Sequence, residues 1–208
     1  MKRILVIICA LSVCFCQSLS AQKQHSDLYN EIGVDAGPAS LVGGFIYGSV
    51  GFFSAIGGGL SHKPVDMKYH GNYGLHYYYQ VKPWCQVGVK FTVESMRLIH
   101  YSDTLRTTIT RVDKDVLFAL MPSVRFTYLN RPWVRLYSGV DVGCGYLWSG
   151  TTSYDSKDEG EEGSKNKNFL FAFNVTAFGV NVGKKFYGLF ELNAGYDAIV
   201  KVGIGARF

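Results

Sequence analysis

The sequence has few of the residues that build disulfide-bonded or nucleic-acid-binding proteins. It contains 5 cysteines in 208 residues, and only Cys85 and Cys144 lie beyond residue 21. Two cysteines do not make a disulfide framework. The formal charge is +5, and it falls by two to +3 without Lys2 and Arg3. A charge so small and dispersed predicts no binding to nucleic acid.

Long apolar runs and prolines are also scarce. Beyond residue 21 the chain has no run of 18 apolar residues, which argues against a transmembrane helix there. It has only 5 prolines but 24 glycines, 14 tyrosines, 14 phenylalanines and 3 tryptophans. This balance of glycine and aromatic residues favours many short strands over helices. The length fits one domain, and no linker divides it.

Residues 1–21 have the pattern of a secretory signal peptide. Basic residues at positions 2 and 3 precede an apolar run over 4–16, and a small-residue stretch follows at 18–22. The apolar run is shorter than the ~20 residues that span a bilayer. We therefore predict cleavage near Ala21 and a single mature domain over 22–208.

A basic turn motif occurs three times. The sequences VKPW, NRPW and GKKF end at Trp84, Trp133 and Phe186. Each motif separates two stretches of alternating apolar and polar residues, which is typical of a tight turn between antiparallel strands. With these turns in place the sequence predicts eight strands, at 27–37, 67–82, 84–101, 115–129, 133–148, 168–183, 186–196 and 198–208.

The predicted connections alternate in length. Long ones are expected at 38–66 and 149–167 and a medium one at 102–114, and the others are tight turns. Outer-membrane barrels have long loops at one end, short turns at the other and an even number of strands. The acidic, glycine-rich connection 149–167 is expected to be a solvated loop. The apolar connection 38–66 fits equally well a short amphipathic helix at a membrane surface and an extension of the first strands.

The alternation also separates the two faces of each strand. One face is apolar, and the other carries five acids and five bases. Matched charges indicate an enclosed interior because an unpaired buried charge is costly, and side chains just fill an eight-stranded barrel. We therefore predict a packed, charged lumen and an apolar, lipid-facing outer face. The expected lumen residues are Glu31, Asp35, Lys90, Glu94, Arg125, Arg135, Asp141, Glu191, Lys201 and Arg207. Among them we expect Arg125 or Arg135 to pair with Glu94 or Asp141.

The last nine residues alternate strictly and end on an aromatic residue. This pattern resembles the terminal signal that bacterial outer-membrane barrels present to the barrel assembly machinery. The alternative is an ordinary edge strand that ends on phenylalanine by chance. The apolar residues of this signal are Val200, Val202, Ile204, Ala206 and Phe208.

Most of the mature chain resembles a known family. Segments 120–137, 182–185 and 191–196, together with the terminal strand, resemble small outer-membrane β-barrel proteins of Bacteroidales, broadly the OmpA-transmembrane and OmpX-like barrels. The resemblance implies an all-β, eight-stranded, antiparallel, transmembrane up-and-down barrel in the outer membrane of a Gram-negative bacterium. As partners we expect outer-membrane lipid, the barrel assembly machinery and an extracellular ligand bound through the loops. We expect a monomer.

No residue pattern predicts a catalytic, cofactor-binding or metal site. His70 and His76 lie on one strand face but six residues apart, about 20 Å at the rise of a strand, so they cannot share a metal. His100 and Ser102 are similar to the pair of lipid A deacylases on the outer face of a barrel, with Asp113 or Asp115 near enough to orient the histidine as a general base. A lipid A hydrolase is therefore a minor alternative.

The sequence favours a non-enzymatic barrel whose loops have a structural or surface-interaction role. A narrow pore for small or apolar solutes is an alternative that requires an unfilled lumen. A soluble, lipocalin-like barrel that holds a lipid is another, and it requires the apolar face to point inward.

Overall fold

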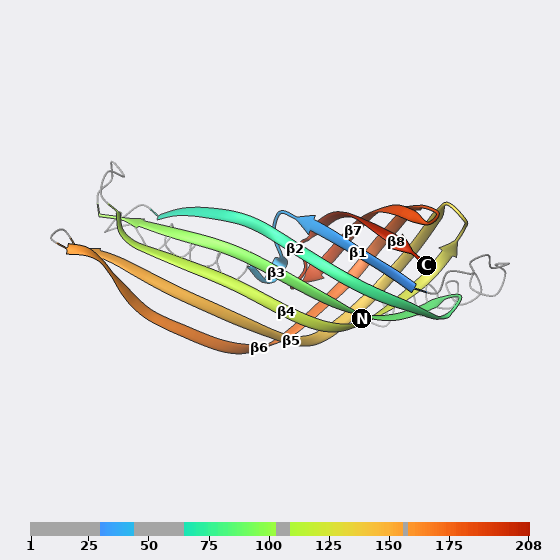
Figure 1. Ribbon diagram of the computed structural model, residues 1–208, viewed down its shortest axis with the longest axis horizontal. Helices are drawn as coiled ribbons and strands as arrows, with labels where there is room; N and C mark the ends of the chain where they lie inside the picture. The colour runs from blue at the N-terminus through green and yellow to red at the C-terminus, as the bar shows by residue number, and fades with distance from the viewer. Residues whose placement is uncertain (1–29, 44–64, 103–108, 156–157) are drawn as a thin grey trace, which may run out of the picture.

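The computed structural model describes residues 30–43, 65–102, 109–155 and 158–208. There, eight antiparallel strands form a closed barrel in which each strand pairs with its sequence neighbour and β8 returns to β1 (Figure 1). The strands are β1 (Asn30–Gly37), β2 (Val65–Lys82), β3 (Cys85–Tyr101), β4 (Ile109–Asn130), β5 (Val134–Asp155), β6 (Asp158–Gly183), β7 (Phe186–Gly195) and β8 (Val200–Arg207). The predicted eight-stranded up-and-down barrel is confirmed. The predicted signal peptide lies outside the described residues.

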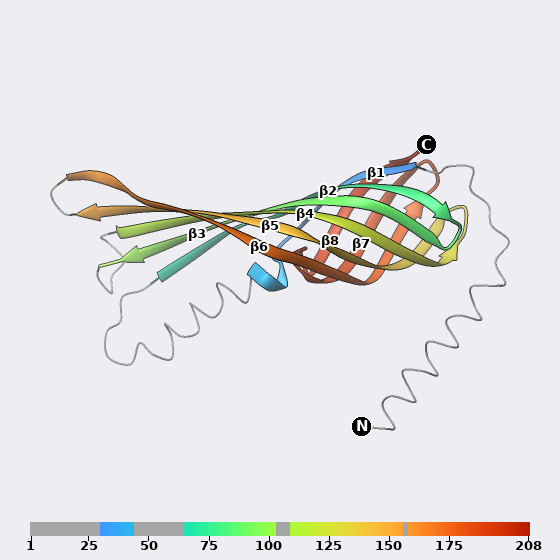
Figure 2. The same cartoon turned by 90° about the horizontal axis from the view of Figure 1, so that it is seen from below.

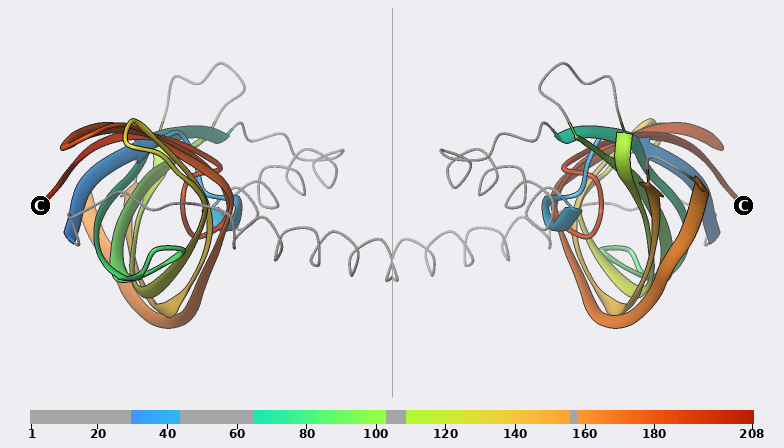
Figure 3. Two further views of the ribbon diagram at one scale, coloured as in Figure 1. Left: turned by 90° about the vertical axis from the view of Figure 1, so that its right-hand side faces the viewer. Right: turned by 90° about the vertical axis from the view of Figure 1, so that its left-hand side faces the viewer.

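The strands differ greatly in length. β1, β7 and β8 have 8, 10 and 8 residues, whereas β2 to β6 have between 17 and 26. The barrel is therefore closed over a short height, and β2 to β6 continue beyond it as a curved open sheet, which we call the extension (Figure 2). The views along the long axis in Figure 3 show the strands closing into a ring. No helix in the described ranges is long and apolar enough to cross a membrane.

The extension corrects two predicted loops. β4 already begins at Ile109, within the expected loop 102–114, and β5 and β6 together occupy nearly all of the expected loop 149–167. In that segment Thr152 pairs with Glu162 and Ser153 with Glu161. The polar, acidic sequence shows no apolar alternation because both faces of the hairpin lie outside the barrel, so the periodicity that identified the other strands is missing.

The connection after β1 is described only at its start. Ser40 forms an isolated antiparallel bridge with Ala198, and a helical turn follows at 41–43. The backbone N–H of Gly43 donates to Ser40 Oγ at 2.8 Å, as at the N-terminus of a helix. The remainder of the apolar connection, over 44–64, lies outside the described residues.

The three predicted turns lie together at the opposite end of the barrel. Trp133 O accepts a hydrogen bond from the N–H of Gly183 at 2.8 Å, which ties the second turn to the third. Gly183 has φ +135°, and a Cβ there would collide with the carbonyl oxygen of Phe186. The three predicted hairpins are confirmed, and their motifs form one rim that we call the turn end.

Close strand contact at the seam between β1 and β8 requires a small residue on β8. We expect Gly203→Ala to destabilise the barrel by about 1–3 kcal/mol, as overpacking does. Its Cβ would collide with the carbonyl oxygen of Val34 and lie 2.7 Å from Asp35 Cβ, both on β1. Urea unfolding of the refolded barrel, followed by tryptophan fluorescence, measures the change. Gly188→Ala is the control because its Cβ meets nothing closer than 4.0 Å. Equal midpoints for the two variants would contradict this account of the seam.

Candidate functional site

The ten charged residues predicted for the lumen all lie inside the barrel. Each has an exposed fraction of 6% or less. Strand alternation places them there, since in β7, for example, every second residue is buried and the residues between are exposed. The interior therefore holds a dense set of ionic groups that must satisfy one another.

Glu31 is the centre of the group nearest the turn end. Its Oε1 lies 3.1 Å from Arg125 Nη1, and its Oε2 lies 3.1 Å from Arg207 Nε and 3.3 Å from Arg135 Nη1. Three guanidinium groups from β4, β5 and β8 thus surround one carboxylate from β1. Arg135 Nε is also satisfied, because it donates to Asn130 Oδ1 at 2.9 Å.

Arg125 connects this group to the far wall. Its Nη2 lies 2.8 Å from Glu191 Oε1, which also accepts a hydrogen bond from the Tyr137 hydroxyl at 2.7 Å. The guanidinium carbon lies 3.6 Å from the ring centre of Tyr78 and 4.5 Å from that of Tyr137. Arg125 therefore crosses the lumen, held by two carboxylates and two aromatic rings.

Two lysines form a second group toward the loop end, and the carboxylate of Asp197 joins them. Lys90 Nζ lies 3.0 Å from Asp141 Oδ2 and 3.0 Å from Asp197 Oδ2. Lys201 Nζ lies 2.7 Å from Asp35 Oδ1 and 2.7 Å from Asp197 Oδ2. Asp197 comes from the connection between β7 and β8, which folds inward and leaves it fully buried. This connection closes the charged part of the lumen at the end that faces the extension.

The arginine pairing predicted from the sequence is wrong. Arg125 and Arg135 pair with Glu31 and Glu191, not with Glu94 or Asp141. The partners lie across the lumen at the same height, and that height depends on the tilt and stagger of the strands, which alternation does not reveal.

Glu94 differs from the other lumen acids. Its Oε2 accepts a hydrogen bond from Asn72 Nδ2 at 3.0 Å, and its Oε1 accepts none from the described residues. Within those residues no cation pairs with it, although its side chain is only 3% exposed. It lies level with the loop end of β1, since Asn72 pairs with both Gly37 and Glu94.

The interior becomes apolar on β4 and β6 toward the loop end. Leu117, Ala119, Met121, Ala172 and Tyr196 form one buried cluster there. The expectation of a polar inner face fails at these positions because residues 116–121 are apolar on both faces, so alternation gives no signal. The lumen is consequently charged at the turn end and apolar where the extension begins.

The extension carries a polar cluster on its inner face. His100 Nε2 lies 3.1 Å from Asp113 Oδ2, while Asp113 Oδ1 lies 2.8 Å from Arg111 Nε and accepts a bond from Thr151 Oγ1 at 2.7 Å. Asp113 lies four residues beyond Leu117, the β4 partner of Glu94, and so beyond the closed barrel. Burial favours its neutral form, but the bonds from Arg111 and Thr151 outweigh burial, so the pKa of the Asp113 carboxyl lies below its ordinary value.

This cluster does not match the predicted hydrolase pair. His100 continues the inward-facing series of β3 and thus faces the concave side, not the outer face that was expected. Ser102 is exposed, and no hydrogen bond joins it to His100 in the described structure. The histidine has the expected orienting acid, Asp113, but among the described residues no hydroxyl or thiol is hydrogen-bonded to its ring.

The predicted placement of His70 and His76 on one face of the strand is also wrong. His76 is buried in the lumen, with Nδ1 2.9 Å from Asp35 Oδ2 and Nε2 3.3 Å from the Tyr187 hydroxyl. His70 is exposed, because a register shift between Tyr69 and Gly71 reverses the facing of the strand. Among the described residues no group of three or more acids, histidines or cysteines could hold a metal.

The outward-facing residues include the other predicted sets. Trp84, Trp133 and Phe186 stand at the turn end with exposed fractions of 40%, 61% and 75%. The terminal apolar series points outward on β8, where Ile204 is 67% exposed. That series comprises Val200, Val202, Ile204, Ala206 and Phe208, and its strand pairs with β1 to close the barrel.

Sequence reasoning missed Asp197 and the lumen tyrosines. Asp197 was assigned to a short turn, and a turn aspartate ordinarily faces solvent. Tyr78, Tyr137 and Tyr187 lie on inward positions, but an aromatic residue gives no polar signal in an alternation. Their positions opposite arginines could be found only by placing the strands around the barrel.

The comparisons with known proteins concern fold. No family model matches the chain, and no curated protein matches it. It is similar to the N-terminal β-barrel domain of Pseudomonas aeruginosa OprF, with a TM-score of 0.41, 11% identity, and coverage of 88% of this chain and 100% of that one. It is also similar to Ail, the attachment invasion locus protein of Yersinia pestis, in complex with the heparin analogue sucrose octasulfate, with a TM-score of 0.41, 12% identity, and coverage of 86% and 95%.

Glu191 and Glu94, both buried in the lumen, provide a matched test of ion pairing. We expect Glu191→Gln to lower the free energy of unfolding by about 3–5 kcal/mol, because it leaves Arg125 and the lysines short of a counter-charge in the lumen. Glu94→Gln should cost less than about 1 kcal/mol, since Glu94 has an amide partner and, among the described residues, no cationic one. Urea titration of both variants measures the difference. Similar losses for the two would show that the charge pairing does not decide stability.

Proposed function

We propose that the protein is an integral β-barrel of the outer membrane of a Gram-negative bacterium, and that it is not an enzyme. Its role is structural or depends on surface interactions made by the extension. The observation that carries this proposal is the inverted polarity of the barrel, with ionic groups buried inside and large apolar side chains exposed outside. A water-soluble barrel has the opposite arrangement.

The outer face supports a lipid environment. Val34, Val202 and Ile204 on β1 and β8 are 51%, 59% and 67% exposed, and they belong to a nearly continuous apolar surface. Soluble proteins rarely expose so much contiguous apolar surface. At the turn end Lys184 Nζ lies 4.8 Å from the ring centre of Trp133, an arrangement suited to the boundary between lipid and water. This end would face the periplasm.

The interior favours a closed barrel over the two alternatives. A pore needs an unfilled lumen. Arg125 crosses the lumen, and the group of Lys90, Lys201 and Asp197 fills it farther from the turn end. A lipocalin-like barrel needs an apolar interior over its full height, and the charged groups occupy the turn end. We therefore expect no conductance above background in planar bilayers.

The extension supports a role at the cell surface. It would stand beyond the bilayer, because β1, β7 and β8 are only about as long as a membrane-spanning strand of ~9–11 residues. Its concave face carries the cluster of His100, Arg111, Asp113 and Thr151, whose mutual bonds hold it in shape. A rigid sheet with a fixed polar face is suited to contact a ligand or a partner outside the cell.

A gel experiment tests the membrane proposal. The mature protein in detergent should run faster unboiled than boiled, because a closed barrel resists unfolding by the gel detergent at room temperature. Fractionation of the native cells should place it with the outer membrane. A single band from a soluble fraction would sink the proposal and favour the lipocalin-like barrel.

The cost in unfolding free energy of a lysine placed on the outer face shows whether that face contacts lipid. We expect Val140→Lys, six residues into β5 from the turn end, to cost about 2–4 kcal/mol in liposomes, and Val81→Lys, at the turn end, about 0–1 kcal/mol. Both valines are exposed, at 45% and 53%. Urea unfolding from liposomes supplies the two values. In a water-soluble barrel both substitutions would be nearly neutral, so equal small effects would contradict a lipid-facing surface.

A further inference from the structure

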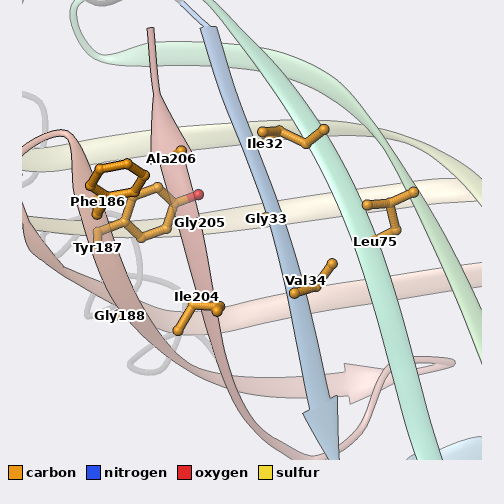
Figure 4. A pocket seen from close by; sticks show the side chains of 10 residues that line it. All are labelled: Ile32, Gly33, Val34, Leu75, Phe186, Tyr187, Gly188, Ile204, Gly205 and Ala206. Atoms are coloured by element: carbon orange, nitrogen blue, oxygen red, sulfur yellow. The ribbon is translucent and has the colours of Figure 1, made fainter.

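An apolar groove crosses the outer face of the short strands. It has a volume of about 680 Å³ and lies over β2, β1, β8 and β7. Figure 4 shows Ile32, Val34, Leu75, Phe186 and Ile204 around it. Sites that bind small molecules measure ~300–1,000 Å³. The groove is therefore large enough to hold part of a ligand, and its walls are suited to an apolar one.

Glycines make the floor of the groove, and two of them are explained by the interior. A Cβ on Gly33 would lie 2.6 Å from His76 Nε2 inside the barrel. A Cβ on Gly205 would collide with the ring of Tyr187, which packs under β8. Both positions face the lumen, so inner packing requires glycine there whatever lies outside.

Gly188 has no such reason to be glycine. It faces outward, and a Cβ there would meet no atom closer than 4.0 Å, the carbonyl oxygen of Gly203. Its outward neighbours on β7, Phe186 and Phe190, are large. The missing side chain at Gly188 relieves no clash, and it leaves the groove open beside Phe186.

The groove opens beside a rigid, basic turn. Arg207 Nη1 donates to the carbonyl oxygens of Gly183 at 2.9 Å and Lys184 at 3.1 Å, and its backbone N–H donates to Lys185 O at 2.8 Å. Lys185 is exposed and directly precedes Phe186 in the groove wall. The backbone of Lys185 is thus held beside the groove wall, at the end that would meet the membrane surface.

We propose that this groove binds one phospholipid, with an acyl chain against Gly188 and the phosphate at Lys185. The inference rests on the proposed function, because the site is continuous with the surface that would face lipid. An apolar groove with Lys185 at its end is complementary to a lipid whose acyl chain leads to a phosphate group. A second copy of this protein fits less well, because a twofold contact through this face would bring two Lys185 side chains toward each other.

Native mass spectrometry of the barrel refolded in detergent tests the site. With palmitoyl-oleoyl phosphatidylglycerol as the probe, we expect one retained lipid per barrel. Gly188→Leu fills the groove and should weaken retention at least tenfold. Ala194→Leu, at another outward position of β7, is the matched control and should retain the lipid like the unmodified protein. Lys185→Gln should weaken phosphatidylglycerol about fivefold and leave dioleoylglycerol, which has no phosphate, unchanged.

The unboiled gel band of each variant shows whether it has folded, and Phe186→Ala, which removes one wall, replaces Gly188→Leu if that variant fails. Equal lipid loss in Gly188→Leu and Ala194→Leu would overturn the inference in favour of a general lipid belt. A dimer that Gly188→Leu abolishes would overturn it in favour of a second copy. A barrel that is heat-modifiable and fractionates with the outer membrane but retains no lipid refutes this inference alone, whereas a soluble, unshifted protein refutes the proposed function as well.

Discussion

The structure depends on the pairing of charged side chains that are buried in the lumen. Arg125 shows the constraint most clearly, because its guanidinium bonds to Glu31 on one side and Glu191 on the other, between the rings of Tyr78 and Tyr137. A buried charge left without a partner is costly, so every strand that contributes to this set must keep its height and its facing. The network thereby fixes the stagger of the barrel as well as filling it.

The unequal strands divide the molecule into two parts with different tasks. Where all eight strands are present, the wall is complete, ionic inside and apolar outside. Where only β2 to β6 continue, the sheet is open and its concave face carries apolar residues first and then the polar cluster around Asp113. The β7–β8 connection folds inward and separates the closed barrel from the extension, since Asp197 closes the ionic region on the side of the extension. The proposed membrane anchor and the proposed contact surface therefore share one sheet.

Much of this arrangement was predictable, and the failures have physical causes. The basic turn motifs located three hairpins, and alternation assigned all ten charged residues to the interior. It failed at 149–167, where strands outside the barrel need no apolar face, and at His70, where a bulge at Gly71 reverses the facing. It also failed to identify the ion pairs, because residues such as Glu31 and Arg125 come from strands that do not pair with each other.

The sequence by itself determined that the ten charged residues face inward, because the period of a strand is two and the polarity of those strands follows it. It also determined the number of strands through its turn residues. Only the tertiary structure decided which charges meet, that Asp197 enters the lumen, and that three short strands leave an open extension. These depend on the tilt and relative height of strands around a closed ring, and no local pattern along one strand contains that information.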